Sequence, residues 1–167
     1  MIANYGRRAM GASGWGYVTP CRGSVEATLK ALHDEVFQEL FGDDEEYGSL
    51  AELYADEDMS ESGTHSILDV YRIVETTEPP QEREADYFTL RPLTASRLVH
   101  HFGTDRPTVR QYEEAMTRAY EAMDTRPLGT EDTTLLGEDR MRWTGVYVVL
   151  YTDNRPSHVG FFGSSGD

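Results

Sequence analysis

The chain contains one cysteine, Cys21, and one lysine, Lys30, in its 167 residues. A single cysteine excludes an intramolecular disulfide, and a single lysine leaves Lys30 as the one side chain that could form a Schiff base. No apolar run approaches the roughly 20 residues that a membrane-spanning helix needs. We therefore expect a soluble cytoplasmic protein that folds around a hydrophobic core, and no sequence pattern indicates a cofactor.

Basic residues are scarce overall, since 15 Lys and Arg face 30 Asp and Glu and leave a net charge of −15. Arginine accounts for all of the 15 except Lys30, which is typical of a GC-rich bacterial genome. The deficit is concentrated between Lys30 and Arg72, where residues 31–71 hold thirteen Asp or Glu and no Lys or Arg. A field of this sign disfavours binding to nucleic-acid phosphates. It favours association with a basic protein.

The acids of this stretch gather in clusters whose mutual repulsion would be relieved by water, a cation or a basic partner. We predict that they form an acidic face that engages a basic macromolecular partner, an arrangement common among immunity proteins and antitoxins. The alternative is a solvated acidic loop that only keeps the protein in solution. The residues predicted to contact the partner are Asp43, Asp44, Glu45, Glu46, Asp56, Glu57, Asp58 and Glu61.

Apolar residues recur every three or four positions after Ser24, which predicts an amphipathic helix capped by Ser24 and ended by Gly42. We interpret His33, on this helix, as a surface histidine. Ser49 and Glu52 have the spacing of a capping box and predict a second, short helix. The predicted helices after the first run from Ser49 to about Ala55, from Thr94 to Gly103, and from near Pro107 to Met123.

The β-branched segment 66–75 is apolar on both faces and predicts a central strand. Residues 142–151 and 158–162 flank a turn-forming segment and predict a hairpin. Shorter strands are predicted at 17–20 and 87–93. Together these elements predict a single α+β domain, with a mainly antiparallel sheet of four or five strands and three or four helices. The domain would span residues 11–167 and follow a flexible tail, 1–10, in which Met10 is a second candidate start.

Three segments carry a resemblance to known proteins. They are GASGWGYVTP at 11–20, GTHSILD at 63–69 and GFFGSSGD at 160–167. These segments resemble those of a family of small uncharacterised bacterial proteins with GASGW-like and GxSGD-like ends. The resemblance implies no activity, cofactor or site residue.

An enzyme is the competing interpretation, because small polar residues directly before an apolar strand are typical of a pocket at the strand entrance. His65 would then be the acid or base, with Arg22, Tyr17 and Cys21 converging on it in a cofactor-independent transferase or hydrolase. Arg22 followed by the segment 62–66 is similar to the Arg and Ser-Thr-Ser elements of mono-ADP-ribosyltransferases. The Glu-x-Glu element of that family is missing here.

A calcium loop is the second alternative. Asp58, Ser60, Ser62 and Asp69 stand at ligand positions of a twelve-residue loop, with Gly63 at the sixth position. Serine replaces the usual carboxylates at two of these positions and Asp replaces the bidentate Glu at the last, so any such site would be weak. The histidines have no spacing typical of a zinc site.

Overall fold

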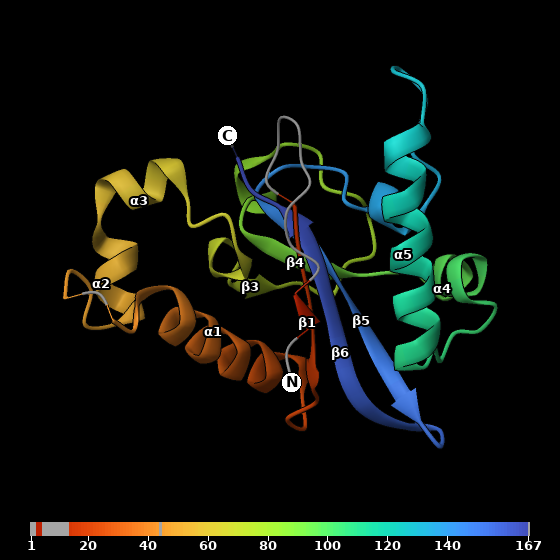
Figure 1. Ribbon diagram of the computed structural model, residues 1–167, viewed down its shortest axis with the longest axis horizontal. Coiled ribbons are helices and arrows are strands. Elements are labelled where there is room, and N and C mark those ends of the chain that lie inside the picture. The colour runs from red at the N-terminus through yellow and green to blue at the C-terminus, as the bar shows by residue number, and fades with distance from the viewer. Residues whose placement is uncertain (1–2, 5–13, 44, 167) are drawn as a thin grey trace.

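The computed structural model describes residues 3–4, 14–43 and 45–166, and within them the chain forms five α-helices and a six-stranded sheet (Figure 1). Along the row from β1 through β2 and β6 to β5 the neighbouring strands are antiparallel, and β4 and β3 add parallel pairs. The predicted α+β domain is confirmed, with a sheet that is not purely antiparallel. The strands in spatial order are β1 (Ala3–Asn4), β2 (Gly14–Pro20), β6 (Arg155–Ser164), β5 (Thr144–Thr152), β4 (Thr89–Pro92) and β3 (Arg72–Ile73).

Side-chain caps fix where the helices begin. The Ser24 hydroxyl accepts the Ala27 amide at 3.0 Å at the start of α1 (Val25–Phe41), and Ser49 does the same for Glu52 at the start of α2 (Leu50–Ala55). Because a cap depends on neighbouring residues alone, the sequence predicts these starts well. The further helices are α3 (Glu57–Ser62), α4 (Ala95–Phe102) and α5 (Val109–Thr125).

The predicted terminal hairpin is confirmed as β5 and β6. Asp153 and Asn154 at its turn have φ of 50° and 61°, the left-handed values that a two-residue hairpin turn requires. Ala3 pairs with Val18 in the short contact between β1 and β2. Residues 3–4, which we expected in a flexible tail, are thus part of the sheet, and the rest of the tail lies outside the described residues.

The prediction of a central strand over residues 66–75 is wrong. Residues Ile67–Asp69 form a 3₁₀ turn, whose start is fixed by the Ser66 hydroxyl accepting the Leu68 amide at 3.1 Å. Only Arg72–Ile73 is a strand, at the edge of the sheet. The apolar residues of this segment are buried because the turn packs beneath α1, so they are apolar for a reason other than sheet pairing.

His33 is one of the contacts that hold this turn. Its Nε2 lies 3.0 Å from the carbonyl oxygens of both Ile67 and Val70, so it carries the proton and donates to them. Burial lowers the pKa of His33, which keeps the ring neutral. The surface interpretation of His33 is therefore wrong: the side chain faces inward and joins α1 to the 3₁₀ turn.

Helices cover both faces of the sheet, with α1, α2 and α3 on one side and α4 and α5 on the other (Figure 1). Successive side chains of β6 enter the two resulting cores, Phe161 on the α1 side and Phe162 on the α5 side. Glycine at position 160 makes room for the Tyr112 ring, which a Cβ atom would approach to 2.5 Å. Both cores are thus anchored on the same central strand.

Candidate partner-binding surface

The acidic segment, residues 43–61, lies beyond the C-terminal end of α1 and includes α2 and α3 (Figure 1). Both short helices project from the side of the sheet opposite α4 and α5. Most of the acidic residues in the segment face solvent. The exposed ones are Asp43, Glu45, Glu46, Glu52, Glu57, Asp58 and Glu61, and Asp44 lies outside the described residues.

Three apolar or aromatic side chains fasten the acidic segment to the core. Leu53 is buried between α2 and the core beneath α1. The Tyr47 ring meets Phe41 edge to face at a centroid distance of 5.7 Å, and the Tyr54 hydroxyl donates to the Leu68 carbonyl at 2.6 Å. The charges are therefore displayed on a surface with defined geometry instead of on a loose loop.

Asp56 has a structural role that the sequence did not indicate. Its carboxylate caps α3 by accepting the Met59 amide at 3.0 Å and also accepts the Tyr47 hydroxyl at 3.0 Å. The Met59 amide and then the Tyr47 hydroxyl hold the pKa of Asp56 below its ordinary value. Although we predicted Asp56 as a partner contact, each of its carboxylate oxygens accepts a hydrogen bond within the protein.

Compensating cations lie at the other end of α1. Lys30 pairs with Asp34 at 3.1 Å, and Arg22 approaches Glu35 at 3.8 Å. Neither basic residue belongs to the acidic segment, and no Lys or Arg occurs between residues 31 and 71. The early acids of the stretch are thus ordinary helix-surface residues, and the excess negative charge belongs to the segment that follows.

An aromatic pocket opens beside the acidic segment. Its cavity has a volume of about 170 Å³, similar to the roughly 150 Å³ cavity that accommodates a benzene molecule. Four aromatic rings from separate parts of the chain line it, and α2 and α3 supply one wall. The lining residues are Leu53, Tyr54, Met59, Ser60, Thr64, Leu68, Asp69, Tyr71, Phe88 and Trp143.

Two of these rings stand on strained backbone. Phe88 and Trp143 have φ of 64° and 61°, a left-handed conformation that costs a bulky residue about 1–3 kcal/mol. They precede the parallel strands β4 and β5, and each is followed by a threonine. The Thr89 and Thr144 hydroxyls donate to carbonyls three residues back, both at 2.6 Å. The same local device thus places an aromatic ring at each strand start.

Asp69 lies in the wall of the aromatic pocket with 7% of its surface exposed. Its Oδ1 accepts the Thr64 amide at 2.7 Å and the Thr64 hydroxyl at 2.9 Å, and its Oδ2 accepts the Ser165 hydroxyl at 2.5 Å. Gly63 and Gly166 permit this arrangement, because a Cβ atom on either would lie within 2.6 Å of the Trp143 ring. The GTHSILD segment and the GFFGSSGD segment therefore meet at Asp69.

The four residues of the enzyme interpretation lie in different environments. Tyr17 is in the core, where burial raises the pKa of its hydroxyl to about 12. Arg22 is exposed and approaches Glu35, and Cys21 leads into α1. His65 is exposed at φ 55°. None of the four lines the aromatic pocket or the second cavity described below.

The segment predicted as a calcium-binding loop is largely helical. Residues 57–62 form α3, in which the Ser60 and Ser62 hydroxyls donate to the carbonyls of Glu57 and Asp58. Asp69 lies behind Thr64, and its oxygens face that residue and Ser165 instead of Asp58. Across the described parts of the chain, no three His, Cys, Asp or Glu side chains are grouped as metal ligands.

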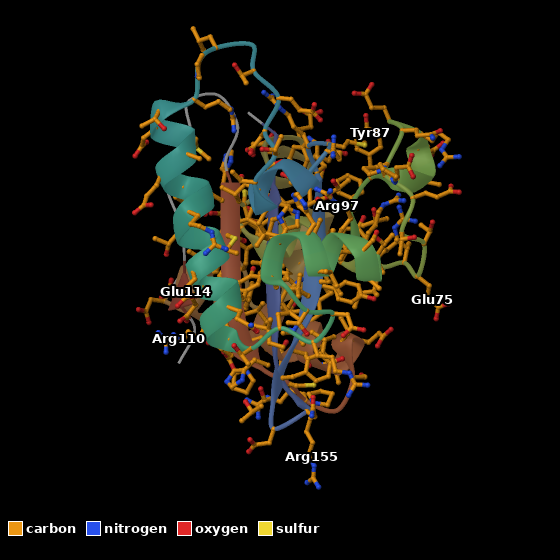
Figure 2. All side chains as sticks on the ribbon, turned by 90° about the vertical axis from the view of Figure 1, so that its right-hand side faces the viewer. Glu75, Tyr87, Arg97, Arg110, Glu114 and Arg155 are labelled. Atoms are coloured by element: carbon orange, nitrogen blue, oxygen red, sulfur yellow. The ribbon has the colours of Figure 1, made fainter. Side chains whose placement is uncertain are left out.

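A second cavity, of about 360 Å³, lies on the other face of the sheet and is lined by three arginines. Two of these are paired with buried carboxylates: Arg91 contacts Asp86 at 2.6 Å, and Arg97 contacts Glu138. Figure 2 views this face, with Arg97 labelled at α4. His101 also reaches Glu138 Oε1 at 2.7 Å. Burial alone would raise the pKa of Glu138, but its contacts with His101 and Arg97 lower it.

Comparisons with family models, curated proteins and solved structures find no match to this chain. None of the helices in the described residues is long and apolar enough to cross a membrane. The function therefore has to be inferred from the surface and the pockets themselves.

The sequence predicts the acidic surface but not the aromatic pocket. One signal was available, because Phe88-Thr89 and Trp143-Thr144 repeat an aromatic residue followed by threonine at the start of two strands. The contact between Asp69 and Ser165 could not be predicted, since the two residues are 96 positions apart in the chain.

Proposed function

We propose that this is a cytoplasmic binding protein that engages a basic macromolecular partner through the acidic segment, as an immunity-like or antitoxin-like neutraliser or regulator. One observation carries the proposal: seven exposed acids of residues 43–61 are displayed on two short helices and the connection that precedes them, with no Lys or Arg in the segment. Placing like charges on an ordered surface is unfavourable for the isolated protein. A basic partner offsets that repulsion and is steered toward the surface, so association should be fast and salt-sensitive.

The prediction concerns the exposed acids of the segment other than Glu52, whose carboxylate accepts the Gly48 amide at 2.7 Å. Changing Asp43, Glu45, Glu46, Glu57, Asp58 and Glu61 to Asn or Gln should lower the association rate constant for the partner by about tenfold or more. The partner is first isolated from the source cell on the full chain at low salt. Its association rate is then measured against the wild type and the variant at low and high salt.

A matched control removes the same number of charges elsewhere. Glu114 and Glu121 lie on α5, where Figure 2 labels Glu114 beside Arg110. Neutralising six acids outside the segment gives an equal change in net charge and should alter binding far less. An unchanged rate in the segment variant, or an equal loss in both, would sink the proposal. The control set is Asp105, Glu114, Glu121, Asp124, Glu131 and Asp153.

A further inference from the structure

Among the described residues, the buried Asp69 carboxylate has neutral hydrogen-bond donors but no cation beside it. Its contacts within the described residues are one amide and two hydroxyls, from Thr64 and Ser165, and no ion pair includes it. A carboxylate offers about four acceptor positions, so one position on Oδ2 remains beyond the three donors. Buried carboxylates in proteins are usually paired with a positive charge, and no charged partner of Asp69 is present in the part of the chain that the structure describes.

The remaining walls of the pocket suit a cation. Tyr54 and Tyr71 are 40% and 48% exposed, and their ring centroids are 5.5 Å apart. Tyr71 stacks on Phe88 at 5.5 Å, and Phe88 meets Trp143 edge to face at 6.0 Å. Aromatic rings attract positive charge through their electron-rich faces. A row of four rings ending beside a carboxylate is the chemistry of a site for one organic cation.

The size and the position of the aromatic pocket limit which group can bind in it. The cavity holds about one ring-sized group, so a large ligand would not fit within it. It borders the acidic segment, because Leu53, Tyr54, Met59 and Ser60 belong to both. A side chain projecting from a basic protein bound on that segment would therefore enter the pocket from the same side. Arginine fits best, since its planar guanidinium both stacks on aromatic rings and hydrogen-bonds a carboxylate.

We propose that the aromatic pocket receives one arginine side chain of the basic partner, with its guanidinium against Tyr71 and Tyr54 and directed toward Asp69. This proposal rests on the function proposed above and specifies its central contact. A buried aromatic and charged anchor surrounded by solvated charges is the usual layout of a strong protein interface. The acidic segment steers the partner, and the pocket selects a particular residue on it.

The test uses small probes and the full chain. Nα-acetyl-arginine methylamide is titrated at constant ionic strength while the indole N–H signals of the two tryptophans, Trp15 and Trp143, are followed by NMR. We expect the Trp143 signal to shift with a dissociation constant on the order of millimolar, and Trp15 to stay unchanged. The uncharged isostere Nα-acetyl-citrulline methylamide should bind about tenfold more weakly. Equal binding of the two probes, or no shift at Trp143, overturns the proposal.

A second probe and three variants test which cation the pocket prefers and which residues bind it. Tetramethylammonium tests the other source of an organic cation, and tighter binding of that ion than of the arginine probe would overturn the assignment to a side chain. Tyr71→Leu removes a partly exposed ring and should weaken the arginine probe about two- to fivefold, whereas Tyr71→Phe keeps the ring and should bind as the wild type does. Asp69→Asn should remove the preference for arginine over citrulline, and a fold check by NMR accompanies it.

The outcomes separate this proposal from the one on which it rests. Tyr71→Leu changes no charge and should leave the salt dependence of partner association intact while speeding dissociation. The six-acid variant of the segment should show the reverse, with slower association and a Trp143 response to the probe that persists at high salt. A probe that binds when the six acids prove irrelevant would leave the pocket valid and remove the steering surface. A pocket without probe binding would leave the surface valid.

Discussion

Replacing Arg91 by methionine is expected to lower the free energy of unfolding by about 3–5 kcal/mol, because it leaves a buried carboxylate without its closest cation. Arg91 is 6% exposed and Asp86 is 3% exposed. The Arg91 Nη2 donates to Asp86 Oδ1 at 2.6 Å, and the Nη1 donates to the Glu78 carbonyl at 2.8 Å. Loss of the guanidinium therefore also frees the loop that holds Glu78.

Arg83 provides a control on the same carboxylate. Its Nε reaches Asp86 Oδ2 at 3.2 Å, but its side chain is 61% exposed, so Arg83→Met should cost about 1 kcal/mol or less. Urea unfolding of both variants at neutral pH measures the difference. Similar losses for the two variants would mean that burial does not set the strength of these pairs. The Gln81 amide and both guanidinium groups hold the pKa of Asp86 well below its usual range, so its contribution is lost only in acid.

Asp139→Asn is expected to remove a large pH dependence of stability. Burial raises the pKa of the Asp139 carboxyl to about 7, even though Ser164 and Thr144 hydroxyls beside it act in the opposite direction. Its Oδ1 is shielded from solvent and has no hydrogen-bond partner within the described residues. An unfolded aspartate titrates near pH 3.9. The native state therefore holds a proton between about pH 4 and pH 7 that the unfolded state has released.

Because the native state holds this extra proton, Asp139 makes the protein less stable as the pH rises. The contribution of Asp139 is complete below about pH 4 and declines as the pH rises, with a total loss on the order of 4 kcal/mol once the pH passes about 7. His33 and His101, whose pKa values burial lowers, act in the opposite sense below about pH 6.5. The measurement is therefore the difference in unfolding free energy between wild type and Asp139→Asn from pH 4 to pH 8. A difference that stays constant over that range would contradict the assignment.

Local signals in the sequence predict the element boundaries well. Ser24, Ser49 and Thr94 each cap a helix whose start the sequence places correctly, because the donor and acceptor are three residues apart. The hairpin follows from two strands and the Asp153-Asn154 turn between them. These features need no knowledge of the rest of the fold.

Long-range packing explains what the sequence does not predict. Segment 66–75 has the composition of a central strand, yet its apolar side chains are buried by α1 and not by neighbouring strands. Burial is what the apolar pattern reports, and a strand is only one way to achieve it. His33 was misplaced for the same reason, since the two carbonyls that it contacts belong to that segment.

The candidate binding surface likewise has one part that the sequence predicts and one part that it does not. A run of acids without Lys or Arg can be counted in the sequence, so the acidic segment was predictable. The aromatic pocket was not, because Tyr54, Tyr71, Phe88 and Trp143 come together only through the order of the strands. Asp56 shows the limit of counting charges, since its carboxylate belongs to a helix cap.

The place of β6 in the sheet has a consequence for synthesis on the ribosome. Residues emerge N-terminal first at about 5–20 per second, so β2 and β5 both leave the ribosome before the strand that joins them. Gly163 of β6 pairs with Trp15 on one side and Gly145 on the other. A nascent chain whose residues have left the ribosome only as far as residue 154 thus carries two unjoined sheet fragments with open edges, which favour aggregation. Emergence of residues 155–164 allows β6 to close both edges.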